Sequence, residues 1–228
     1  MLTLNVERLH MPSEISFWWG WWVNAAAAGA TFLAVLVALF GQAFRGKFFP
    51  PKLGLRLLDS KGEKAVARLA WVEDGQVNDR MEDCRYYHLQ VTNARRWSPA
   101  HEVQVVLLRV EEPAPQGGWR VEWTGAIPLG WRHQQLYSTS RTVGTQADVD
   151  LCSVIKDKWL ALHPLITPFN LKVQRREPCV LCLTIQAQSS ECDSQSIRVK
   201  VAWDGKWHDG AQEMLGHLSV EVLDEHAH

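Results

Sequence analysis

The cysteines are the residues of this sequence best suited to bind a metal. Cys179 and Cys182 have the two-residue spacing found in zinc sites, and Cys192 with Cys84 or Cys152 would complete a thiolate set. Structural zinc sites place the closely spaced pair on a tight turn, where both sulfurs converge. Here the pair lies in an apolar run that predicts a β-strand, so the two side chains point to opposite faces. We therefore expect no metal, no disulfide within this pair, and thiols that stay reduced, as in a reducing compartment.

Two other patterns suggest hydrolysis. Arg96 and His101 have the arginine–histidine spacing of HEPN ribonucleases, but Pro99 denies them the helix on which that motif works. Asp148 and Asp150 would share one face of a strand, where paired carboxylates can perform acid–base catalysis. Such a pair is more commonly the solvated start of a strand. Because no nucleophile elbow, zincin motif or P-loop is present, we predict a non-enzymatic protein without a cofactor; an enzyme would need a polar pocket of converging titratable groups.

Tryptophan and arginine gather in one stretch of the chain. These residue types are enriched at binding hot spots, although the core of a β-domain also uses tryptophan. The sequence therefore offers two interpretations, an interaction surface or core packing. The candidate interaction surface consists of Trp119, Arg120, Trp123, Trp131 and Arg132.

The first fifth of the chain contains a long apolar segment. No charged residue occurs in 17–44, which as a helix would extend about 42 Å and cross a bilayer. Tryptophans cluster in 18–22, as at the headgroup level of a membrane. We predict a transmembrane helix over 17–44, with a short extracytoplasmic segment at 1–16 and a linker at 45–51. A cleaved signal peptide is the alternative, but the residues before the apolar run are not basic.

Small residues recur along this helix at every fourth position. Ala26, Ala30, Ala34 and Ala38 would form one slowly drifting ridge. In lipid, close approach along small residues favours association of helices, so a homo-oligomer through this helix-association face is one expectation. Alanine is also common in monomeric membrane helices, which leaves the monomer open.

The flanks of the helix predict its orientation. Arg8 is the only basic residue of the N-terminal segment, whereas Arg45, Lys47, Lys52 and Arg56 follow the helix closely. The positive-inside rule then places the N-terminus outside and the C-terminal domain in the cytoplasm. The chain carries 24 basic and 25 acidic residues, a balance that argues against nucleic acid as a partner.

The segment 52–223 predicts an antiparallel β-sandwich or barrel, with a short tail at 224–228. Asp204 and Gly205 predict a two-residue turn that leads into Lys206 and Trp207. Period-2 and β-branched runs predict ten strands. They are 52–58, 65–72, 86–92, 102–110, 120–123, 151–155, 158–162, 179–187, 197–203 and 217–223.

The segments Tyr-His-Leu-Gln-Val-Thr-Asn at 87–93 and Ala-His-Glu-Val-Gln-Val-Val-Leu-Leu at 100–108 resemble the strand pair of CARDB-type and related immunoglobulin-like bacterial modules. This resemblance implies an immunoglobulin-like sandwich. The layout of helix and β-domain is also similar to that of uncharacterised bacterial proteins, which implies an inner-membrane setting. We expect a membrane-tethered module that binds a protein partner or itself; the alternative is a membrane-perturbing effector of a bacterial defence or toxin system.

Overall fold

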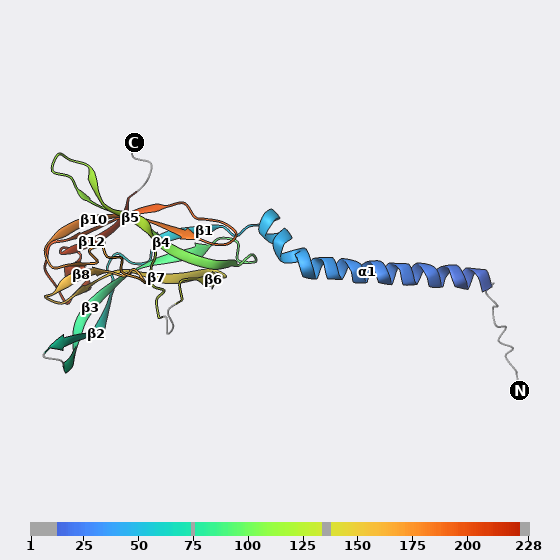
Figure 1. The fold of residues 1–228 in the computed structure, drawn as a ribbon, viewed down its shortest axis with the longest axis horizontal. Helices are drawn as coiled ribbons and strands as arrows, with labels where there is room; N and C mark the ends of the chain where they lie inside the picture. Colours follow the sequence, from blue (N-terminus) through green and yellow to red (C-terminus); the bar gives the residue numbers. More distant parts are fainter. Residues whose placement is uncertain (1–12, 74–75, 134–137, 224–228) are drawn as a thin grey trace, which may run out of the picture. The chain divides into compact units, whose positions relative to one another are not determined.

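The computed structural model describes residues 13–73, 76–133 and 138–223 (Figure 1). The chain divides into two compact units, with the boundary between Phe49 and Pro50. The predicted tail at 224–228 and most of the predicted segment 1–16 lie outside the described residues.

The first unit is the helix α1, Ser13–Phe48. Within it, Trp18–Gly41 is long and apolar enough to cross a membrane, and no part of that window is buried. The helix therefore extends beyond the predicted membrane segment at both ends and includes most of the predicted linker. It ends just before Pro50 and Pro51, since proline cannot continue a helix and favours an extended residue before it.

The second unit is an antiparallel immunoglobulin-like β-sandwich, as predicted. Its first sheet has the order β1-β3-β7-β8-β9. The long strand β3 pairs with β2 through its N-terminal half and with β1 through its C-terminal half. The bounds of these strands are β1 Leu53–Leu57, β2 Glu63–Glu73, β3 Gln76–Asn93, β7 Gln146–Ile155, β8 Trp159–Leu162 and β9 Gln174–Arg175.

The second sheet has the order β12-β11-β10-β4-β5, and β6 pairs with the start of β4. The hairpins β2–β3 and β4–β5 extend beyond the body of the sandwich (Figure 1). The bounds are β4 Ala100–Pro113, β5 Trp119–Pro128, β6 Arg141–Val143, β10 Cys179–Gln188, β11 Ile197–Trp203 and β12 Leu218–Leu223, with a short helix α2 at Ala211–Met214.

Alternation along the strands builds the core between the sheets. Leu89 and Val91 of β3 and Leu181 and Leu183 of β10 belong to one buried cluster, whereas Gln90 and Cys182 between them do not. Trp203 is also part of this cluster, and Trp207 packs against it, which agrees with core packing for these two rings.

All ten predicted strands are present, and β6 and β9 are additional. One local prediction was wrong: Asp204 and Gly205 do not form a two-residue turn between paired strands. Gly205 does adopt a positive φ of 88°, and the Asp204 carboxylate accepts the Lys206 backbone N–H at 2.9 Å. The chain then runs through α2 before β12 returns beside β11, and on the way Asp209 contacts Arg85 and Lys64 of the opposite sheet.

Candidate functional site

Polar side chains form a row on the outer face of the first sheet. The pairing of β3 with β7 sets His88 opposite Asp150 and Gln90 opposite Asp148. The His88 Nδ1 lies 2.9 Å from the Asp150 carboxylate, and Gln90 Nε2 donates to Asp148 at 3.0 Å. Gln90 in turn accepts from Arg56 of β1 at 3.0 Å. The strand period therefore gathers this row from three strands.

A small cleft lies beside this row. It has a volume of about 210 Å³ and is lined by side chains of β2, β3 and β7 and of the segment that follows β5. Arg132 forms ion pairs across it with Glu63 and with Asp148, the latter at 3.6 Å. The complete lining consists of Glu63, Ala65, Tyr86, His88, Arg132, His133 and Asp150.

Two histidines flank the ring of Tyr86. Its ring stacks on His163 with 5.3 Å between centroids and on His88 with 6.1 Å. His163 Nε2 also lies 2.9 Å from the Ser153 hydroxyl. Burial lowers the pKa of His163 below its usual 6.5, so this ring is neutral at physiological pH.

This cluster is a polar pocket with converging titratable groups. The Ser153 residue is only 2% exposed, so its hydroxyl does not reach a substrate. Each carboxylate of the row already pairs with a cation, a histidine or an amide. Asp148 and Asp150 are thus not the simple solvated strand start that the sequence favours, because both are tied into this network.

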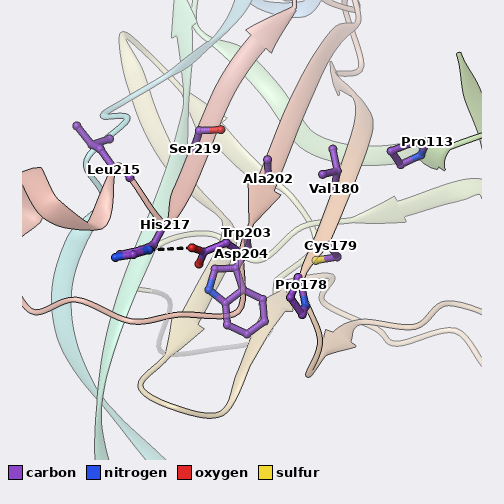
Figure 2. A pocket seen from close by; sticks show the side chains of 11 residues that line it. Pro113, Pro178, Cys179, Val180, Ala202, Trp203, Asp204, Leu215, His217 and Ser219 are labelled. Atoms are coloured by element: carbon purple, nitrogen blue, oxygen red, sulfur yellow. Dashed lines mark hydrogen bonds and ion pairs between the residues drawn. The ribbon is translucent and has the colours of Figure 1, made fainter. Parts of the chain in front are cut away.

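A larger groove lies on the outer face of the second sheet, with a volume of about 490 Å³. Its floor is a row of three small side chains on adjacent strands, Val180 of β10, Ala202 of β11 and Ser219 of β12, which the strand register sets side by side (Figure 2). Pro113 and Pro178 lie along one margin (Figure 2). Because the side chains of the floor are small, they leave a depression in the outer surface of the sheet.

The opposite end of this groove is polar. His217 Nδ1 lies 2.9 Å from the Asp204 carboxylate, and the two side chains meet beside Trp203 (Figure 2). Cys179 also lines the groove, and burial raises the pKa of its thiol to about 11, so the sulfur is protonated and a weak nucleophile. The groove therefore combines an apolar floor with a hydrogen-bonding end, the usual make-up of a binding site.

The structure separates the five residues of the candidate interaction surface. Trp123 and Trp131 are 6% and 3% exposed and pack in the core, so these two rings do not line a surface. The indole N–H of Trp123 donates to Asn170 at 3.2 Å. Arg132 belongs to the cleft of the first sheet. Only Trp119 and Arg120, at the start of β5, remain near one another on the surface, where Arg120 pairs with Glu112 at 3.3 Å.

The predicted helix-association face lies on α1, where Ala26, Ala30, Ala34 and Ala38 are all exposed. In the sandwich, all five cysteines are free, and Cys179 and Cys182 lie three residues apart in one strand. Among the described residues, no group of three histidine, cysteine or acidic side chains is placed to hold a metal ion.

Sequence reasoning singled out Asp148 and Asp150 of the His88 row but missed their partners, and it missed the groove. Neither the row nor the groove has a local motif, because His88 and Asp150 are 62 positions apart and meet only through strand register. No protein-family model matches the sequence, and no curated protein is detectably similar to it. The structure supports the resemblance noted above at its coarser level, a β-rich domain preceded by an apolar helix.

Proposed function

We propose that the protein is a membrane-tethered, non-enzymatic interaction module at the cytoplasmic face of a bacterial inner membrane. In this proposal α1 is the anchor, and the sandwich binds a protein partner through the groove on its second sheet. Tethering raises the local concentration of the domain at the membrane, so a contact of modest affinity is sufficient.

The groove is the observation that carries this proposal. On the same face, the rows that follow are charged: Lys200 pairs in register with Glu221 and with Cys182, and Arg198 binds Glu111 at 3.0 Å. The row of Val180, Ala202 and Ser219 is thus a hollow of small, mostly apolar side chains. Such a hollow accepts an apolar side chain of a partner.

The apolar span and its flanks support the anchoring. The window Trp18–Gly41 has 24 residues, or about 36 Å of helix, which exceeds the hydrocarbon thickness of about 30 Å. Between Glu14 and Asp59 the sequence contains no acidic residue but four basic ones, all after the span. This asymmetry favours a cytoplasmic sandwich.

The test is a substitution that fills the groove with a large side chain. Ala202→Arg places a long charged side chain in the hollow, whereas the control Glu221→Arg adds the same side chain outside it, on the next strand. Tagged full-length chains are purified in mild detergent, together with an untagged or differently tagged second copy. Proteins that copurify with the wild type and with Glu221→Arg, including a second copy, should be lost with Ala202→Arg.

The same set of copurifying proteins for all three chains would contradict this proposal. Thermal unfolding of both variants establishes that the sandwich is folded, which is expected because Ala202 is partly exposed on the outer face.

The alternative function, an effector that perturbs the membrane as its helices cluster, is supported by one observation. The four alanines of the helix-association face are exposed on α1. A membrane-potential dye distinguishes the two functions: overproduction of an effector depolarises cells, and it does so only when its helix-association face is intact.

A further inference from the structure

The start of the sandwich is fixed to the loop between β3 and β4. The Lys52 carbonyl accepts the Ala94 backbone N–H at 2.9 Å, and the Pro50 carbonyl accepts the Arg95 guanidinium at 2.8 Å. On the other side, the Cys192 thiol donates to the Pro51 carbonyl at 3.1 Å. Residues 50–52, through which the sandwich is connected to α1, therefore form one rigid piece with residues 94–99.

A buried side chain builds this loop. Asn93 is 3% exposed, and its amide donates to the Ser98 carbonyl at 2.7 Å. Its side-chain oxygen accepts the backbone N–H groups of Lys52 at 3.2 Å and Arg95 at 3.0 Å. The Ser98 N–H closes a turn onto the Arg95 carbonyl at 2.8 Å. The conformation of the loop is therefore set before any ligand is bound.

The loop presents a cation and an aromatic ring to solvent. Arg96 is exposed, and Trp97 is 57% exposed. An exposed indole next to an arginine is well suited to the lipid–water interface, where the ring lies at headgroup level and the guanidinium pairs with phosphate. Lys52, also exposed, adds a second solvent-facing cation to the same piece.

The net charge of the piece formed by residues 50–52 and 94–99 is positive. Lys52, Arg95 and Arg96 belong to this piece, and Arg45 and Lys47 precede it in sequence. The neighbouring loop between β10 and β11 contributes two acids, Glu191 and Asp193, and the Glu191 carboxylate is occupied by the His101 backbone N–H at 3.0 Å. The piece itself contains Lys52, Arg95 and Arg96 and no acidic residue, and this positive charge attracts an anionic surface.

Residue 49 alone separates the end of α1 from residues 50–52 in sequence. Pro50 is two residues past Phe48, a reach of at most about 7 Å. From Gly41, where the apolar window ends, to Phe48 the helix rises about 10 Å. We propose that residues 94–99 together with Lys52 form a docking surface for the headgroups of anionic phospholipids. This inference rests on the proposed anchoring of α1 in a membrane.

The experiment is photocrosslinking from full-length protein in vesicles of equal parts phosphatidylethanolamine and phosphatidylglycerol. The photoreactive residue p-benzoylphenylalanine replaces Trp97, Arg96, Val66 or Leu33 in turn. Val66 is the matched control, because it is also 57% exposed but lies on β2, away from the loop. Leu33 reports whether α1 is in the bilayer at all. Mass spectrometry then measures the yield of lipid adduct at each position.

Lipid adduct should form several-fold more at positions 97 and 96 than at position 66. Adding Arg96→Glu to the position-97 probe, or using phosphatidylcholine alone, should lower that yield several-fold. A strong adduct at position 33 with no excess at 96 and 97 over 66 overturns the docking surface and leaves the anchoring intact. No adduct at position 33 overturns both. Adducts at 96 and 97 to protein instead of lipid also overturn it.

Discussion

Among individual residues, Asn93 has the clearest structural role. It ends β3 in the segment that resembles bacterial immunoglobulin-like modules, and its side chain joins the connection to the helix, the β3–β4 loop and the β6–β7 turn. A single buried amide thus satisfies backbone groups from three segments, which an apolar residue of similar size would leave without partners.

Asn93→Ala should lower the free energy of unfolding by about 2 to 3 kcal/mol, because it leaves buried backbone groups without hydrogen bonds. Denaturant unfolding of the full chain in detergent measures this loss. The control is Thr92→Ala at the preceding position, whose hydroxyl makes only a 3.4 Å contact with the Gly54 carbonyl. Its loss should stay under about 1 kcal/mol. Equal losses for the two variants would contradict the role given to Asn93.

His163 should make stability depend on pH. Burial lowers the pKa of the folded ring, whereas the unfolded ring protonates as the pH falls through about 6.5. The unfolded state then binds more protons than the folded state, so stability declines as the pH falls below about 6.5, by at most about 1.4 kcal/mol per pH unit. His163→Gln should flatten this slope between about pH 7 and pH 5. An unchanged slope in the variant would show that His163 is not responsible.

At the scale of elements, the strands were predictable and their partnerships were not. Alternation along 86–92 and 179–187 identifies β3 and β10, since one face of each is apolar. The strands β6 and β9 have only three and two residues, too few for a period to show. The His88 row depends on a register that shifts between Tyr87 and His88, and nothing in the local sequence marks that irregularity.

The lack of a local sequence signal also explains why the positions of the tryptophans could not be predicted. Trp123 and Trp131 carry no sequence signal that separates a core ring from a surface ring, because tryptophan suits both environments. The groove was hidden for a related reason: Val180, Ala202 and Ser219 become neighbours only when three strands align.

The helix α1 allows a direct test of its small-residue ridge. Ala34→Ile adds bulk on the ridge and should weaken self-association in a membrane two-hybrid assay, since close backbone contact is lost. Leu36→Ile, on another face of the same helix, should leave the signal unchanged. If both variants and the wild type give the same signal, the ridge does not mediate association, and the effector function loses its main support.

At the scale of the whole molecule, the expected arrangement is an N-terminus outside and a sandwich in the cytoplasm. A C-terminal reporter that is active only in the cytoplasm should be active, and one that is active only in the periplasm should be silent. Replacing Arg45, Lys47 and Lys52 with alanine should mix the two orientations, whereas Arg8→Lys should not. Arg56 is left in place because it binds Gln90. A periplasmic signal from the wild type would reverse the arrangement.

The strand β1 gives the protein a mechanical property. It is the first strand after the helix and pairs with the C-terminal half of β3 through five consecutive residues, Leu53↔Asn93 to Leu57↔Leu89. Tension applied to Pro50 along the axis of β1 loads these pairs in shear, all at once, whereas a perpendicular pull would unzip them one by one. The contacts of Pro50 and Lys52 with the loop share that load. A partner that pulls on the sandwich therefore meets its first resistance at β1, where hydrogen bonds and the packing of Leu53, Leu55 and Leu57 hold the chain without a disulfide.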